Sequence, residues 1–314
     1  MGNQTFLNEL FFSGLSDIPS LQLPLFLFFL LIYLLTLIWN SLIIVLVVTD
    51  SHLHVPMYFF LGNLAGIDLC SSSVTVPRML FDLHTETRKI SIQACIAQVF
   101  FFFFLADSEI FLLAVMSYDR YTAVCRPLHY TQIMSWKVCG QFASIIWCFA
   151  LTNSLLHTLC VLNLRFCGSD IIESFFCDLP QLLQISCSDV FINILLIFVF
   201  GAILGGGPMI LTIVSYVYIF RTVLKMQVKD TMSKVYSTCT SHLTVVFLFY
   251  CSIMFNYFRP SRNQHFSGDK VVSVFYTAIV PLLNPLIYSL RNQDLRKAIH
   301  NVFKRIVSTV IYSQ

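Results

Sequence analysis

Several acidic residues lie inside long apolar segments of this chain. Asp68, Asp107 and Glu109 each stand within hydrophobic sequence, and Asp119 is followed directly by Arg120 after another apolar run. Ionisable groups inside a membrane are costly and usually mark ion sites, ligand contacts or conformational switches. A charge at the membrane edge costs much less because its side chain reaches water. We therefore expect the adjacent acid and base where a spanning helix leaves the bilayer.

Asp68 and Glu109 are predicted to lie at the same depth in the membrane. Counted along a helix from Pro56 and back from Arg120, they lie about 18 Å and about 16 Å from the cytoplasmic face. The hydrocarbon core is about 30 Å thick, so both lie near its middle. Two carboxylates at one level should not both ionise unless they share a cation or a proton. Two interpretations stay open: a shared sodium ion or proton that acts as a switch, or two protonated acids hydrogen-bonded within the bundle.

The composition places these acids in a membrane protein. The chain has 314 residues, of which 57% are hydrophobic and 11% are charged, and its mean hydropathy is +0.78. A soluble chain is nearer about 25% charged. The net charge of +3 is too small to indicate a nucleic-acid partner. No HExxH, GxSxG or phosphate-loop motif occurs, so we expect neither an enzyme nor a cofactor other than the possible sodium ion.

Seven segments are long and apolar enough to span a membrane as helices. They are residues 23–49, 57–82, 92–125, 139–162, 190–224, 234–258 and 269–290. The predicted fold is an all-α bundle of seven transmembrane helices, with a short amphipathic helix at about 292–305 on the cytoplasmic interface. Residues 1–22 would form an outer terminus, 23–290 the bundle and 291–314 a cytoplasmic tail. The segments that face inward under this scheme carry more Lys and Arg, which favours an extracellular N-terminus.

Four motifs in order resemble one receptor family. Residues 116–121 read MSYDRY, 53–68 read LHVPMYFFLGNLAGID, 234–243 read KVYSTCTSHL and 281–292 read PLLNPLIYSLRN. Each is close to a signature of the vertebrate olfactory receptors, a branch of the rhodopsin-like G-protein-coupled receptors, although Ser117 replaces the usual Ala. The resemblance covers nearly the whole chain. It implies an odorant receptor in the plasma membrane that activates a stimulatory G protein and so raises cyclic AMP.

The resemblance also implies roles for individual residues. The activating and G-protein-coupling residues would be Asp119, Arg120, Tyr121, Tyr216, Asn284, Pro285 and Tyr288. Asp68, Glu109 and Asn284 would form the sodium-and-water cluster between the second, third and seventh helices. The expected partners are a small odorant, the α subunit of a stimulatory or olfactory heterotrimeric G protein, and membrane lipid.

The ligand is expected between the outer halves of the third, fifth, sixth and seventh helices. The lining residues favoured by alignment with the family are Phe103, Asp107, Ser108, Leu204, Ile253, Tyr257 and Thr277. An apolar, aromatic cavity suits small hydrophobic molecules. Asp107 departs from the small residue that the family often has. It could pair with an amine ligand, donate a hydrogen bond to a carbonyl when protonated, or join the Glu109 network. The glycines 205–207 could widen the fifth helix or allow close helix packing.

Cysteines and a glycosylation motif are predicted on the outer side. Four of the 11 cysteines fall there, and four cysteines allow three pairings. The family resemblance implies Cys95–Cys177 and Cys167–Cys187. Asn3 begins an Asn-Gln-Thr sequon for N-glycosylation.

Two other functions compete with odorant detection. A receptor of this kind could serve chemosensing outside the nose, which the sequence does not separate from olfaction. A transporter or channel could also use acids inside the membrane. Such a protein predicts internal repeats or paired broken helices, and the sequence shows neither.

Overall fold

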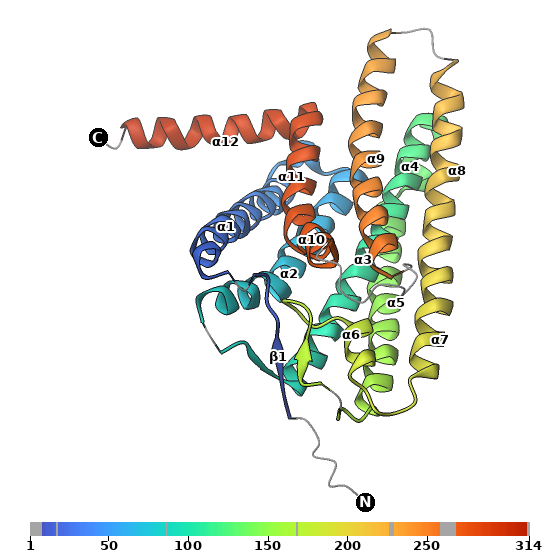
Figure 1. Cartoon of the computed structure of the whole chain (residues 1–314). Helices are drawn as coiled ribbons and strands as arrows, with labels where there is room; N and C mark the ends of the chain where they lie inside the picture. The colour runs from blue at the N-terminus through green and yellow to red at the C-terminus, as the bar shows by residue number, and fades with distance from the viewer. Residues whose placement is uncertain are drawn as a thin grey trace, which may run out of the picture.

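Seven membrane-crossing helical segments form the body of the molecule in a computed structural model (Figure 1). The structure describes residues 8–16, 18–85, 87–167, 169–225, 229–257 and 268–312, and for parts of the last helices it describes the backbone only. The first four long helices are α1 (Pro19–Thr49), α2 (Pro56–His84), α3 (Ile92–Cys125) and α5 (Trp136–Leu162). The predicted boundaries of these four agree with the structure to within a few residues.

The fifth and seventh crossings each contain a π-helical turn. The fifth consists of α7 (Phe191–Phe200), η3 (Gly201–Gly205) and α8 (Gly206–Val223), and the seventh of α10 (Gly268–Val274), η4 (Phe275–Ile279) and α11 (Val280–Arg291). The sixth is α9 (Lys229–Tyr257). Among the described residues, six segments are long and apolar enough to cross a membrane, and α9 contains the shorter apolar stretch Cys239–Met254. The predicted seven-helix fold is confirmed.

Local sequence explains where these helices begin. Pro56 occupies the first turn of α2, where the missing N–H costs nothing. Ser91 caps α3, because its hydroxyl accepts a hydrogen bond from the Ala94 N–H at 3.2 Å. The helices then place large apolar side chains outward: Leu23, Ile38 and Phe198 are all more than half exposed. In water such a surface would be unstable, but in a bilayer it faces lipid.

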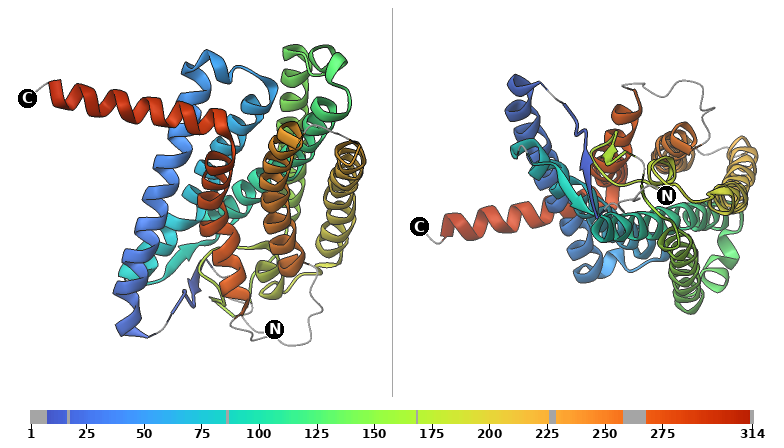
Figure 2. Two further views of the ribbon diagram at one scale, coloured as in Figure 1. Left: turned by 90° about the horizontal axis from the view of Figure 1, so that it is seen from above. Right: turned by 60° about the horizontal axis from the view of Figure 1, so that its bottom comes forward.

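Short elements close one end of the bundle. A three-stranded sheet has the order β2–β1–β3, formed by β1 (Glu9–Phe12), β2 (Lys89–Ser91) and β3 (Ile171–Ile172). Strand β1 pairs antiparallel with β2 and parallel with β3, so the segment near the N-terminus joins two loops that are distant in sequence. Helix α6 (Leu179–Gln184) lies at the same end (Figure 2). The sequence did not predict the sheet or this helix.

Two disulfides hold this end together. The structure joins Cys95 at the start of α3 to Cys177, with an S–S distance of 2.01 Å, and joins Cys167 to Cys187. These are the pairs that the family resemblance implied. The described free cysteines are Cys70, Cys125, Cys139, Cys148, Cys160, Cys239 and Cys251.

The opposite end carries the amphipathic helix. Helix α12 (Gln293–Tyr312) begins where the sequence predicted it but is longer, and it runs across the axis of the bundle (Figure 1). Tyr58 of α2 donates a hydrogen bond to the Asn292 side chain at 2.9 Å and so fixes the corner before α12. The small elements η1 (Ser51–Leu53), η2 (Pro127–His129) and α4 (Tyr130–Ile133) complete the described elements. Strand β1 and α12 lie at opposite ends of the bundle (Figure 1).

Candidate ligand cavity and coupling end

A partly open cavity lies in the half of the bundle nearer the sheet. Its volume is about 90 Å³, well below the range of about 300–1,000 Å³ that is usual for sites of drug-sized ligands. Helices α3, α5, α7 and α9 and the π turns η3 and η4 contribute its walls. The lining residues are Phe102, Phe103, Ala106, Asp107, Ile110, Asn153, His157, Ile197, Phe200, Gly201, Leu204, Gly205, Tyr250, Ile253, Met254 and Tyr276. The cavity suits a small, mostly apolar molecule.

The structure places four of the seven predicted lining residues on this cavity: Phe103, Asp107, Leu204 and Ile253. Tyr257 ends α9, and its side chain lies outside the described part of the chain. Ser108 and Thr277 are not among the described residues that line the cavity. Both hydroxyls turn back on their own helix, where Ser108 donates to the Phe104 carbonyl and Thr277 to the Ser273 carbonyl, each at 2.7 Å.

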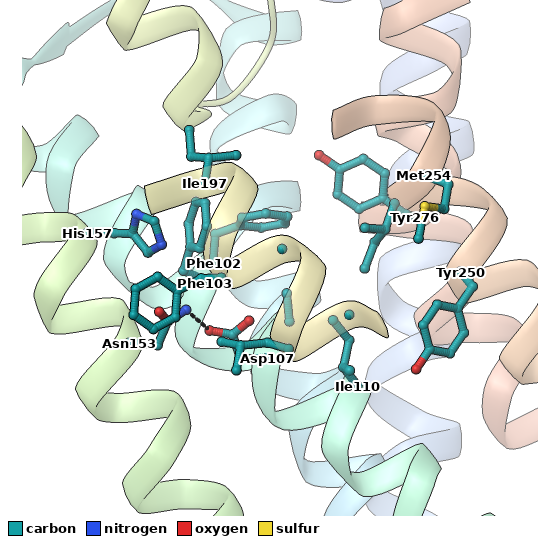
Figure 3. Close-up of a pocket in the computed structure, with 16 residues that line it drawn as sticks. Phe102, Phe103, Asp107, Ile110, Asn153, His157, Ile197, Tyr250, Met254 and Tyr276 are labelled. Carbon is teal, nitrogen blue, oxygen red and sulfur yellow. Dashed lines mark hydrogen bonds between the residues drawn. The ribbon is translucent and has the colours of Figure 1, made fainter. Parts of the chain in front are cut away.

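Helix α5 is the contribution that sequence reasoning missed. Asn153 and His157 lie one helical turn apart on α5, and both line the cavity (Figure 3). Their spacing of four residues places them on one face of a helix. Two polar residues on one face of an otherwise apolar span were a signal that could have been used. Tyr250, Met254 and Tyr276 on the opposite wall were also missed.

Asp107 is fixed by a neighbour on α5. Its Oδ2 accepts a hydrogen bond from the Asn153 side-chain N–H at 2.7 Å (Figure 3), and the Asp107 side chain is only 8% exposed. This contact separates Asp107 from Glu109, which bonds to a different partner. Of the three roles open to Asp107 at the sequence level, joining the Glu109 network is therefore excluded in this conformation.

The π turns widen the helices at the cavity. Leu204 and Gly205 belong to η3, and Tyr276 belongs to η4, so two irregular turns face the same space. A π turn adds a residue to one turn of helix and is frequent at functional sites. The widening was expected at glycines 205–207, but it occurs at Gly201–Gly205. Apart from the backbone of their own helix and their chain neighbours, no described atom lies within 4 Å of a Cβ placed on Gly205, Gly206 or Gly207. Close packing against another helix therefore does not explain these glycines.

The two acids at mid-membrane depth meet at one amide. The Asn284 side-chain N–H group donates to the Asp68 carboxyl at 3.0 and 3.2 Å and to Glu109 Oε1 at 3.3 Å. All three side chains are buried. The Oδ1 atoms of Asn284 and Asn40 are also buried and have no hydrogen-bond partner among the described residues. The structure thus brings the two carboxyls together at the amide nitrogen of Asn284, at the predicted ion site.

The other end of α3 carries the acid–base pair. Asp119 Oδ2 lies 3.1 Å from the Arg120 guanidinium, and Asp119 Oδ1 accepts a hydrogen bond from the Tyr130 hydroxyl at 2.8 Å. Asp119 is 1% exposed and Arg120 is 16% exposed. Burial, and then the Asp119 carboxylate, raise the pKa of the Tyr130 phenol, so Tyr130 stays protonated and donates. Sequence reasoning missed Tyr130, which lies in α4 outside the motifs.

Further predicted coupling residues surround this pair. Tyr216 of α8 is buried, and its hydroxyl lies 2.7 Å from His242 Nδ1 of α9, which links the fifth and sixth crossings. Tyr121 contacts the ring of Tyr218 at 5.8 Å between centroids. The Tyr288 hydroxyl is buried without a hydrogen-bond partner in the described part of the chain.

Pro285 and Asn3 are the two remaining residues that the sequence singled out. Pro285 lies inside α11, where it removes one backbone hydrogen bond. Asn3, the predicted glycosylation residue, lies outside the described residues. The described residues contain no group of three or more His, Cys, Asp or Glu side chains that could hold a metal ion.

Comparisons with known proteins agree with this arrangement. A sequence model described as olfactory receptor matches residues 29–306. Olfactory receptor 1500 of Rattus norvegicus is 45% identical over 96% of this chain and 96% of its own length. Olfactory receptor 5B21 of Homo sapiens is 44% identical over 98% of this chain and 99% of its own. The crystal structure of squid rhodopsin has a TM-score of 0.71 at 18% identity, covering 93% of this chain and 83% of that one, which shows the shared fold.

Proposed function

The chain belongs to the olfactory receptor family, and on this premise we propose that it detects small, mostly hydrophobic odorants in the cavity beside α3 and activates a stimulatory heterotrimeric G protein. It is a multi-pass receptor of the plasma membrane and not an enzyme. The proposed coupling raises cyclic AMP. The proposed G-protein contact is the end of the bundle that carries Arg120.

One observation carries the proposal: a single helix joins the cavity to the acid–base pair. Phe103, Asp107 and Ile110 of α3 line the cavity, and Arg120 lies on the same helix nearer its other end. Ten residues separate Ile110 from Arg120, which is about 15 Å of helix. A shift of α3 against its neighbours when the cavity fills would therefore move the surroundings of Arg120 directly.

The contacts of Arg120 suit a resting state. Its guanidinium is paired with Asp119, and the Tyr216–His242 contact holds α8 to α9 beside it. We propose that activation separates α9 from α8, releases Tyr216 and turns Arg120 toward the α subunit. Tyr121 and Tyr288 are proposed to stabilise that second arrangement, with Pro285 loosening α11.

We propose that the N-terminus faces the outside. The excess of Lys and Arg in the segments at the α12 end supports this orientation. The two disulfides lie at the end where β1 is found, and disulfides persist in the oxidising extracellular space. Glycosylation at Asn3 is part of the same proposal.

Asp68, Glu109 and Asn284 are proposed to hold a sodium ion or a shared proton. Oxygen ligands suit a hard cation, and the buried Oδ1 atoms of Asn284 and Asn40 lack partners among the described residues. An ion there would supply positive charge between two carboxyls. These residues would hold it, and its release would let α3 and α11 repack.

A cyclic AMP reporter assay tests the proposed function. Cells expressing the chain with a stimulatory olfactory α subunit should respond to members of a panel of small volatile molecules, whereas untransfected cells should not. Replacement of the α subunit by an inhibitory one should abolish the rise. A ligand response that persists without any stimulatory subunit would contradict the proposed coupling.

A further inference from the structure

Among the described residues that line the cavity, one side chain is acidic, and the histidine His157 is the one that could act as a base. Asp107 is that acid, and neither Lys nor Arg is present among these lining residues. A buried carboxylate is stable only when it is paired with a cation or well hydrogen-bonded. Asp119, on the same helix, has the Arg120 guanidinium, whereas the described residues provide Asp107 with no cation.

The environment of Asp107 leaves a site for a donor. Its Oδ2 is occupied by the Asn153 amide at 2.7 Å, and no described donor reaches Oδ1. Figure 3 shows the carboxyl within the ring of lining side chains, with Asn153 and His157 on the α5 side and Tyr250, Met254 and Tyr276 across from them. The free oxygen is therefore available to a ligand that carries an N–H or O–H group.

Neighbouring polar atoms also favour a donor. His157 Nδ1 and Asn153 Oδ1 are buried without hydrogen-bond partners in the described part of the chain. An amide oxygen is an acceptor, and a neutral imidazole nitrogen can be one. The Phe103 and His157 rings lie 5.0 Å apart, which keeps His157 at this wall. An acid as ligand would meet like charge here, with neither Lys nor Arg among the described lining residues to compensate it.

Resting on the proposed function, we propose that the cavity selects small amines, with Asp107 pairing the ammonium group and Asn153 positioning that carboxyl. The hydrocarbon part of the amine lies against the apolar walls formed by Phe102, Phe200, Leu204 and Ile253. Asn153 acts through Asp107 and is a positioning residue. The cavity volume of about 90 Å³ limits the ligand to a short chain or a single ring.

Matched ligands of equal chain length test this selectivity. The full-length receptor is purified in detergent, and its melting temperature is measured with hexylamine, 1-hexanol, hexanoate and hexane. The same four compounds are given to reporter cells for cyclic AMP. Hexylamine should stabilise the receptor most and act at a concentration about tenfold or more below that of 1-hexanol, because a charge-assisted hydrogen bond is the strongest available contact.

Variants assign the effect to Asp107. Asp107→Asn keeps the shape and the contact with Asn153, and it should bring hexylamine to within about threefold of 1-hexanol. Asn153→Ala should weaken hexylamine several-fold while leaving the amine preferred. Ser108→Ala is the matched control, because that neighbouring hydroxyl bonds only its own helix among the described contacts, and it should leave the preference unchanged.

The two readouts separate this inference from the proposed function. If hexylamine raises the melting temperature of the wild type but not of Asp107→Asn, the amine site stands even if cyclic AMP does not respond. If other odorants raise cyclic AMP while hexylamine produces no thermal shift, the receptor function stands and the amine site is refuted. Equal effects of amine and alcohol in the wild type, or an effect of hexanoate that exceeds both, would also overturn it.

Discussion

Asp119 and Asp107 are both buried on α3, yet they have different partners. Asp119 has a guanidinium at 3.1 Å and a phenol at 2.8 Å, whereas Asp107 has one neutral amide at 2.7 Å. The end of α3 that carries Asp119 is satisfied within the protein, and the cavity end is not. The difference indicates that the ion pair of Asp119 holds the resting state at one end of α3. At the other end, one oxygen of Asp107 is left to accept a hydrogen bond from a ligand.

The largest effect is expected from a substitution at the end of α3 that carries the Asp119–Arg120 pair. Arg120→Ala should abolish cyclic AMP responses while the receptor still reaches the cell surface, because the residue that would meet the G protein is gone. The measurement combines the reporter signal with antibody staining of intact cells. Arg126→Ala, an exposed cation at the same end of α3, is the control and should signal normally. A normal response in Arg120→Ala would refute the coupling assignment.

The acids at mid-membrane depth are an intermediate case, since they share one amide. Asp68→Asn and Glu109→Gln should each remove the sensitivity of basal signalling to sodium, because one carboxyl alone holds a cation poorly. Basal cyclic AMP is measured in membranes as sodium replaces potassium at constant ionic strength. If both variants keep the wild-type sodium response, the shared-cation proposal fails, and protonated acids within the bundle explain the site.

Tyr130→Phe sharpens the comparison, because it removes a hydrogen bond from Asp119 and leaves the contacts of Asp107 unchanged. The variant loses the hydrogen bond to Asp119 but keeps the ring, and a hydrogen bond to a charged group is worth about 1.5–3 kcal/mol. Basal signalling should rise by about tenfold or more, because the ion pair of the resting state is less well held. His129→Ala, the exposed neighbour, should have no effect. A basal signal that falls in Tyr130→Phe would indicate that Tyr130 serves the active state instead.

The smallest effect is expected from Ser117→Ala, a substitution on α3 between Asp107 and Asp119. The Ser117 hydroxyl lies 3.0 Å from Thr212 Oγ1 of α8, so the residue that departs from the family motif links two helices. Ser117→Ala should lower the stability of the purified receptor by about 1 kcal/mol, with little change in signalling. Thr152→Ala, whose hydroxyl bonds the Cys148 carbonyl of its own helix, is the control for melting temperature. A larger loss in the control would contradict this role.

Sequence was sufficient for features that depend on apolar length and on motifs. The span 92–125 was predicted at the bounds that α3 has, because its apolar run ends at charged residues. Equal depth predicts that Asp68 and Glu109 lie close together, and the family resemblance adds Asn284, which contacts both. In both cases local sequence determines the position, and the helix rise of about 1.5 Å per residue fixes the depth.

Sequence was insufficient for features that depend on the rotation of a helix about its axis or on pairing between distant segments. Ser108 follows Asp107 by one residue, and a rotation of about 100° takes its side chain away from the cavity. Thr277 lies in η4, where the extra residue of a π turn changes which side chains face inward. Strand β1 has only four residues, and its partners β2 and β3 lie far along the chain. Neither its length nor its neighbours in sequence therefore predict that it pairs. Asn153 and His157 belong to no motif.

The central claim is that occupancy of the outer cavity controls the Arg120 end through α3. Ala106 lines the cavity, and Ala106→Phe would fill it while leaving Arg120 and its partners in place. The decisive measurement is the concentration dependence of cyclic AMP for an agonist found in the panel, in wild type and Ala106→Phe at equal surface expression. We predict that the variant loses agonist potency by about tenfold or more but retains basal signalling. An unchanged potency would contradict the account.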